Sequence, residues 1–281
     1  MLAGDVVHKA IRRYILDLNS GRDFREAEAK AYATGLFNAK LEYSAERKYT
    51  TDSKSEAGEC YCALYEHEYG LDVSANVINE NRKLMDSALG QFFTMDIETK
   101  QGPMKLLSLL RNAQSRSPEE RGYSFEYEGW QINPVFDLLL EFANVDRRIP
   151  VVIDWKVEKN FSNDNSQQMH LYGYAVWKRW HSMYGTKPED ITLVEINLLS
   201  GRSKRHAFCD DDVVATDDLM FESIREFNYV VGDRKFEDCD IKEFGLTQNT
   251  NSCSYCNQRK LCIDSLQQEE KEYAADALKL F

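Results

Sequence analysis

Apolar and polar positions change their spacing along the chain, and this change predicts the order of its elements. Apolar residues from Val7 to Leu18 recur at helical spacing and Asn19-Ser20-Gly21 supplies a stop, so we expect a first helix over residues 5–19. From about 23 to 120 the pattern is largely helical and polar, with few strand signals. This stretch predicts a helical cap or insertion.

A strand region extends from Phe125 to Val157. Within it, two short apolar runs cover residues 134–142 and 149–157, and a polar stretch from Asn144 to Arg148 separates them. Apolar runs of this length with polar residues between them are typical of a β-hairpin. We therefore expect the two runs to pair as antiparallel strands.

This hairpin would bring ionisable side chains together on one face. If the turn is symmetric, Phe142 opposes Ile149 and Asp137 opposes Asp154, with Cβ atoms ~5 Å apart. Because side chains alternate along a strand, Lys156 shares the face of Asp154. Two opposed carboxylates repel, and a divalent cation makes their proximity favourable. The face is therefore predicted to be a metal site with a lysine beside it, and a solvated strand face is the alternative.

Helical and strand patterns alternate through the second half of the chain. Residues 164–182 are expected to form a helix, and residues 191–197 and 204–209 a second hairpin around a turn at 200–202. Another helix is expected from about 211 to 231. A segment rich in cysteine then closes the chain.

The composition is that of a soluble globular protein. The chain has 281 residues, of which 43% are hydrophobic and 29% are charged. No apolar run approaches the ~18 residues that a membrane span needs, and the start of the chain lacks the features of a secretory signal. We therefore expect a cytoplasmic protein with no membrane partner.

Cysteine usage indicates a metal rather than disulfides. Three of the seven cysteines, Cys253, Cys256 and Cys262, lie within ten residues of each other, and a cytosolic chain keeps its thiols reduced. A Cys-x2-Cys pair is compatible with zinc, with an iron–sulfur cluster, or with plain buried thiols. The spacing alone leaves these three alternatives open.

The formal net charge of −12 argues against strong nonspecific binding to nucleic acid, since Lys and Arg supply most of that affinity. Charge is unevenly distributed, however. Acidic residues gather at 119–120, 210–212, 217–218 and 267–272, and basic residues at 178–179 and 202–206. A basic channel on an acidic body is compatible with this pattern.

Several short motifs occur in an order that resembles a known family. Gly4-x-x-x-His8 lies on the opening helix, Asp137 in a strand, Asp154-Trp155-Lys156 in the next strand, and Gln168 with Tyr172 on the following helix. This series resembles the motifs of RecB-like nucleases of the PD-(D/E)XK superfamily. The terminal cysteines resemble those of the iron–sulfur branch, which includes CRISPR-associated exonucleases and helicase-nuclease subunits.

The resemblance implies an α/β fold with a restriction-endonuclease-like core, in which helices flank a central mixed sheet. It implies a single nuclease domain over residues 1–281, with the stretch 23–120 as a helical insertion that the family does not explain. The region 239–266 would be the iron–sulfur segment.

The resemblance also assigns the metal site. His8, Asp137 and Asp154 would bind Mg²⁺ or Mn²⁺ through their side chains, and Trp155 through its backbone carbonyl. Lys156 would orient the attacking water or stabilise charge on the phosphate in the transition state.

Two further sites follow from the same resemblance. Gln168 and Tyr172 share a helix face and would contact DNA, the alternative being a surface pair that packs on the sheet. The three terminal cysteines would bind a [4Fe–4S] cluster. The fourth cysteine of the family lies upstream of the histidine, where this chain has none. An internal thiol, Cys60 or Cys62 and then Cys239, would have to substitute, unless the chain is a form shortened at its N-terminus.

The expected function is therefore that of a metal-dependent deoxyribonuclease. We expect an exonuclease acting on single-stranded DNA or DNA ends in repair, recombination or phage- and CRISPR-related processing, with a helicase, recombinase or integrase-type protein as partner. The alternatives are a noncatalytic nuclease-fold module that binds DNA or such a partner, and a zinc-stabilised regulatory protein.

Overall fold

The computed structural model describes residues 2–22, 24–99, 102–118, 123–143, 148–159 and 164–232, and beyond these residues 234–235, 238–240, 243, 250–253, 256, 258–259 and 262. The chain divides into two compact units. The first contains Met1–Phe37 and Ala75–Phe221, and the second Asn38–Ser74 and Glu222–Phe281. Among the described residues, no helix has both the length and the apolar character that a membrane crossing requires.

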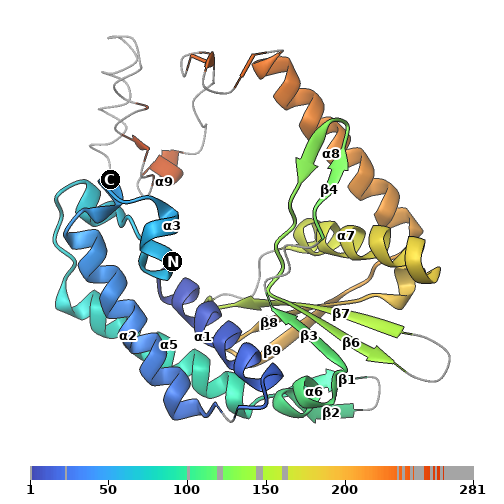
Figure 1. The fold of residues 1–281 in the computed structure, drawn as a ribbon, viewed down its shortest axis with the longest axis horizontal. Coiled ribbons are helices and arrows are strands. Elements are labelled where there is room, and N and C mark those ends of the chain that lie inside the picture. The colour runs from blue at the N-terminus through green and yellow to red at the C-terminus, as the bar shows by residue number, and fades with distance from the viewer. Residues whose placement is uncertain are drawn as a thin grey trace. The chain divides into compact units, whose positions relative to one another are not determined.

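A five-stranded mixed sheet forms the centre of the first unit, with the strand order β3-β6-β7-β8-β9 (Figure 1). β6 and β7 are antiparallel, β7 and β8 are parallel, and β8 and β9 are antiparallel. The strands are β3 (Ser115–Pro118), β6 (Leu138–Ala143), β7 (Arg148–Lys156), β8 (Thr192–Asn197) and β9 (Arg202–His206). The predicted central mixed sheet is confirmed, as are both hairpins.

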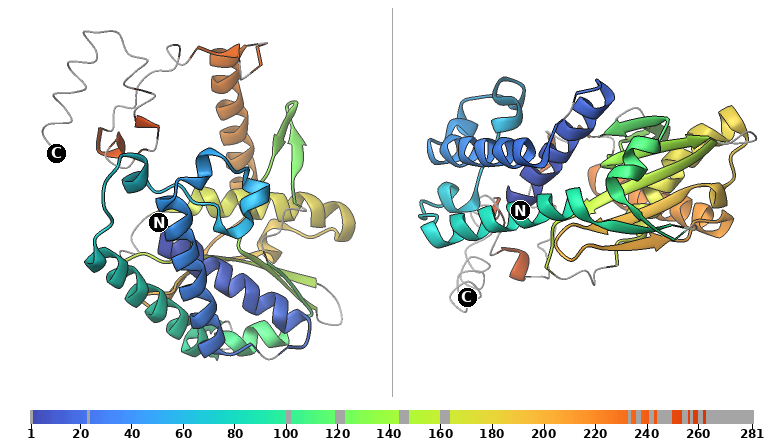
Figure 2. Two further views of the ribbon diagram at one scale, coloured as in Figure 1. Left: turned by 60° about the vertical axis from the view of Figure 1, so that its left-hand side comes forward. Right: turned by 90° about the horizontal axis from the view of Figure 1, so that it is seen from below.

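Helices cover both faces of this sheet. On one face, Val152 and Leu193 pack against Met169 of α7 (Ser166–Tyr184) in the main hydrophobic cluster. On the other face, Trp155 makes an edge contact, at 5.6 Å between ring centroids, with Phe92 of α5 (Ala75–Thr94). α1 (Leu2–Asn19) packs beside α5 (Figures 1 and 2). The central sheet is therefore buried on both faces, which explains why β7 is almost continuously apolar.

The predicted helices appear close to their expected bounds. α1 ends at Asn19 as expected but begins at Leu2, three residues before the expected start, and α7 lies two residues further along the chain than expected. α8 (Asp210–Val231) continues from the first unit into the second. A buried stripe on α1 that includes Val7, Ile11 and Ile15 fixes its orientation toward the sheet.

The stretch 23–120 is helical only in part. It contains α2 (Glu26–Ala45) and α5, but from Asp96 onward it also supplies the hairpin β1 (Asp96–Thr99) and β2 (Gly102–Lys105), the short helix α6 (Leu106–Asn112), and β3. β3 pairs with β6 and is an edge strand of the central sheet. The sequence of β3, Ser-Arg-Ser-Pro, has no apolar alternation, which is why its pattern did not predict a strand.

The remaining described elements are short. β4 (Phe125–Tyr127) and β5 (Trp130–Ile132) form a hairpin in the first unit, and η3 (Pro188–Asp190) precedes β8. The second unit contains η1 (Lys48–Thr50), α3 (Lys54–Ala57), η2 (Gly58–Cys60), α4 (Tyr65–Glu68) and α9 (Thr250–Cys253). The acidic clusters of the sequence at 119–120 and 267–272 lie outside the described residues.

Candidate active site

The register of β6 and β7 determines which side chains meet at the end of the hairpin. Phe142 pairs with Ile149, as predicted, and the same register continues to Leu138 and Ile153. The next pair along this register is Asp137 and Asp154. The predicted opposition of the two acids is therefore correct in register.

Asp137 itself lies one residue before β6, so the prediction that it is a strand residue was wrong. In place of a ladder bond, its side chain closes the end of the hairpin, because the backbone N–H of Trp155 donates to Asp137 Oδ2 at 2.8 Å. The carboxylate thus satisfies a backbone N–H of β7 just beyond the last paired residues of the hairpin. The Trp155 side chain is buried on the opposite face.

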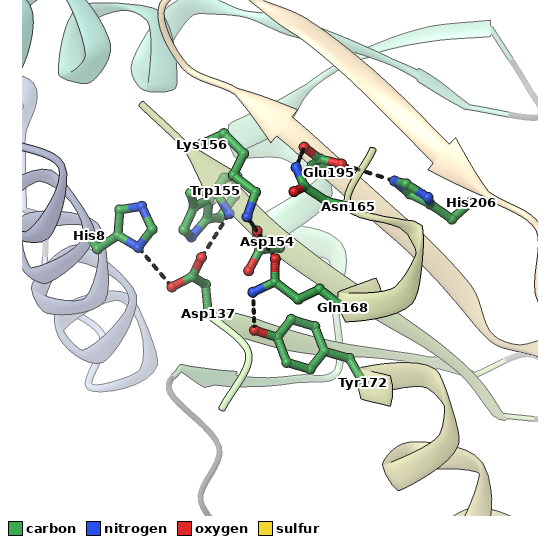
Figure 3. A network of polar contacts seen from close by, with 10 residues as sticks. All are labelled: His8, Asp137, Asp154, Trp155, Lys156, Asn165, Gln168, Tyr172, Glu195 and His206. Atoms are coloured by element: carbon green, nitrogen blue, oxygen red, sulfur yellow. Dashed lines mark hydrogen bonds and ion pairs between the residues drawn. The ribbon is translucent and has the colours of Figure 1, made fainter. Parts of the chain in front are cut away.

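His8 reaches this site from α1, where it is half-buried. Its Nδ1 lies 2.9 Å from Asp137 Oδ1 (Figure 3). Burial lowers the pKa of His8, but the hydrogen bond to Asp137 and the negative charges of Asp137 and Asp154 outweigh it, so the net pKa is raised. The structure thus brings His8 of α1 together with Asp137 and Asp154 of the β6–β7 hairpin, as the sequence predicted.

Asp154 is the buried acid of the site. It is 5% exposed, and its Oδ2 lies 2.7 Å from Lys156 Nζ. Burial, and then the charge of Asp137, raise the pKa of Asp154 to about 6, while Lys156 and His8 oppose the shift. The predicted sharing of one strand face by Asp154 and Lys156 is observed.

Gln168 connects the lysine to the helix above it. Lys156 Nζ donates to Gln168 Oε1 at 2.9 Å, and Gln168 Nε2 donates to the hydroxyl of Tyr172 at 2.7 Å (Figure 3). Gln168 is exposed, whereas Tyr172 is 7% exposed and has its pKa raised by burial and then by the charge of Asp154. The amide of Gln168 therefore orients the ammonium group of Lys156 from one side while Asp154 pairs with it from the other.

The donor atoms suit a hard divalent cation, although they contact one another instead. Among the described residues, no group of three or more His, Cys, Asp or Glu side chains is arranged to hold a metal ion, since His8 bonds to Asp137 and Asp154 pairs with Lys156. However, the carboxylate of Asp154 is buried, and its Oδ2 has the ammonium group of Lys156 as its partner at 2.7 Å. An imidazole with two carboxylates is a donor set that fits Mg²⁺ or Mn²⁺.

A second buried polar group lies on the same sheet face, and the sequence reasoning missed it. Glu195 of β8 is the parallel partner of Asp154. Its Oε1 accepts from Asn165 Nδ2 at 2.7 Å, and its Oε2 lies 3.0 Å from His206 Nε2 (Figure 3). The available signal was an acid directly between two apolar residues, Val194 and Ile196, of the expected strand.

The cysteine segment lies in the second unit. All seven cysteines of the chain occupy half-buried positions, and the described ones do not form a three-residue metal group. Within this unit the segment contacts α4 and Tyr69, the residue that follows α4. Arg259 Nη1 donates to the Tyr65 hydroxyl at 2.9 Å, and the Tyr69 hydroxyl lies 3.5 Å from the carbonyl of Cys256.

The mixed sheet, the flanking helices and the acid–acid–lysine arrangement define a nuclease class. The family model of the PD-(D/E)XK nuclease superfamily matches residues 2–263, and the chain belongs to this superfamily. Its members are nucleases that typically use divalent metals, and a nuclease fold implies DNA binding. A comparison with curated proteins gives no match. The RecB-like group and the iron–sulfur branch stay predictions.

Proposed function

We propose that the protein is a deoxyribonuclease that depends on Mg²⁺ or Mn²⁺ and hydrolyses phosphodiester bonds. The observation that carries the proposal is the convergence of Asp137, Asp154 and Lys156 at the end of β7, with His8 bonded to Asp137. A structural role alone gives no reason to bury an acid whose pKa is raised to about 6 next to a second acid.

His8, Asp137 and Asp154 would hold the cation, with the backbone carbonyl of Trp155. When bound, the cation supplies Lewis-acid stabilisation of the phosphodiester and an acidified water. Asp137 also fixes the end of β7 through the N–H of Trp155.

Lys156 acts on the reacting phosphate. Its ammonium group is held between Asp154 and Gln168, so it is positioned before substrate arrives and loses little freedom in the reaction. From there it stabilises the negative charge that develops on the phosphate or orients the attacking water. Gln168 is exposed and can contact a DNA strand, while Tyr172 acts mainly through its hydrogen bond to Gln168.

We propose further that the substrate is single-stranded DNA or a DNA end, and that the enzyme is an exonuclease of the RecB-like group. The order of the motifs from His8 to Tyr172 supports this assignment. The net charge of −12 supports it as well, because a weak nonspecific hold on duplex DNA suits an enzyme delivered to ends by a helicase, recombinase or integrase-type partner.

A [4Fe–4S] cluster at Cys253, Cys256 and Cys262 is a separate proposal for the second unit. Its support is the x2 and x5 spacing, together with the contacts of Cys256 and Arg259 with Tyr69 and Tyr65. Cys60 and Cys62 lie only a few residues before Tyr65 in the sequence. One of them is the nearest candidate in sequence for a fourth thiolate. The cluster would be structural.

An assay with labelled single-stranded and double-stranded DNA tests the catalytic proposal. The protein is incubated with Mg²⁺, with Mn²⁺ or with a chelator, and products are resolved by length. We expect degradation only with metal, and faster on single strands. DNA binding without cleavage under every metal condition would instead identify a noncatalytic nuclease-fold module.

A further inference from the structure

Glu195 is a buried acid for which the catalytic arrangement has no use. It is 0% exposed on β8, and its carboxylate accepts hydrogen bonds from Asn165 and from His206 rather than contacting Lys156. A buried carboxylate is unfavourable unless it is fully hydrogen-bonded. A strand residue that only filled the core would be apolar, so the acid calls for a specific reason.

Asn165 shows what the carboxylate holds. It is the N-cap residue of α7, a position at which an asparagine side chain usually accepts a hydrogen bond from the first turn of the helix. Here the side chain makes no such bond and donates to Glu195 Oε1 instead. The N-terminus of α7 is therefore hydrogen-bonded to a side chain of β8 instead of being capped by its own asparagine.

His206 secures the other oxygen of the same carboxylate. Its side chain is 3% exposed and that of Glu195 is 1% exposed. Because a carboxylate only accepts, the proton of the 3.0 Å contact lies on His206 Nε2. Glu195 is thus held between β9 and the N-cap residue of α7, and its own rotamer is fixed.

We propose that Glu195, Asn165 and His206 form a positioning network for the catalytic lysine. The network fixes the first turn of α7, which contains Gln168, whose Oε1 meets Lys156 Nζ. The part of this proposal that concerns rate rests on the proposed nuclease function. None of the three residues touches substrate. They act through Gln168.

Asn165→Ala is the sharpest variant, because the side chain it removes makes no cap bond. We expect kcat to fall by about tenfold with KM unchanged, as for other residues that orient a catalytic group. In a Gln168→Ala background the same change should have little further effect on kcat, since the lysine has already lost the contact. Glu195→Gln should behave in the same way.

Asp217→Asn is the matched control. Asp217 also anchors α7, because it accepts from the Tyr174 hydroxyl at 2.8 Å, but it does so two turns further along the helix. It should lower the melting temperature without changing kcat. If Asn165→Ala reduces kcat as strongly in the Gln168→Ala background as in the wild type, the network only stabilises the fold and the proposal is overturned.

A second readout does not need activity. The Gln168 side-chain amide accepts from Lys156 through Oε1 and donates to Tyr172 through Nε2. Its ¹⁵N resonance, assigned by its loss in Gln168→Ala, therefore reports whether the amide is held in this position. We expect it to move toward the position of a solvated glutamine in Asn165→Ala and in Glu195→Gln, and to stay in place in Asp217→Asn. An unchanged resonance in Asn165→Ala would overturn the positioning role. If the wild type cleaves no DNA, the function fails, and this resonance still decides the network.

Discussion

His8 and Asp137 lie 129 positions apart in the sequence, and His8 Nδ1 is 2.9 Å from Asp137 Oδ1. The contact joins α1 to the end of the central hairpin. Both residues would hold the cation in the proposed metal site, so their contact lies within that site.

Metal binding should therefore be visible as stabilisation. A ligand that binds only the folded state, present at 100 times its dissociation constant, adds about 2.7 kcal/mol to the free energy of unfolding. We expect Mn²⁺ to raise the melting temperature of the wild type, and His8→Ala and Asp137→Ala to lose most of this increase. Asp96→Ala is the control, because Asp96 is an exposed acid paired with Lys105. An equal increase in all four proteins would place the ion elsewhere.

Lys156→Gln should separate catalysis from metal binding. The glutamine side chain is one bond shorter than that of lysine and keeps N–H donors, but it carries no charge. We expect kcat to fall by about 10²–10³, the range for loss of one charge-stabilising donor, with the Mn²⁺ dependence of the melting temperature retained. Calorimetry that showed lost metal affinity with retained turnover would contradict the role given to the lysine.

His206 should make stability depend on pH. Burial lowers the pKa of His206, and the hydrogen bond to Glu195 only partly offsets this. A histidine whose pKa is lower in the folded state destabilises the fold as pH drops below the unfolded value of about 6.5. The wild type should therefore lose stability between pH 7 and pH 5, and His206→Gln should remove part of that loss. His181→Gln, at an exposed position, should leave the slope unchanged.

The cysteine segment gives a spectroscopic prediction. Anaerobically prepared protein should be brown and absorb near ~400 nm, as clusters with cysteine ligands do. Cys256→Ser should lose colour and thermal stability together, because a cluster that binds only the folded chain adds its binding free energy to folding. Cys209→Ser, outside the segment, should retain both. Colourless protein that contains neither iron nor sulfide after reconstitution would exclude the cluster, and bound zinc would identify the alternative.

Much of the site was readable from the sequence because it depends on local periodicity. The turn register follows from two apolar runs of similar length, and the alternation within β7 puts Asp154 and Lys156 on one face. The sequence did not predict that β6 begins only after Asp137. The end of the strand depends on the hydrogen bond that the Asp137 side chain accepts from the Trp155 N–H in place of a backbone ladder bond. That is a tertiary contact.

The rest depends on pairing between distant segments. Glu195 lies next to Asp154 only because β8 is parallel to β7, a relationship that no local pattern contains. β3 joins the sheet through backbone bonds to β6, with a polar sequence that shows no strand period. Its place is therefore set by its partner strand and not by its own residues.

The central claim is that the acids at the end of β7 hold a catalytic metal, and Asp154→Ala tests it most directly. The variant is compared with the wild type for Mn²⁺-dependent degradation of labelled single-stranded DNA, with circular dichroism to verify folding. We predict a folded protein with no metal-dependent cleavage. Undiminished cleavage by the pure, folded variant would contradict the claim.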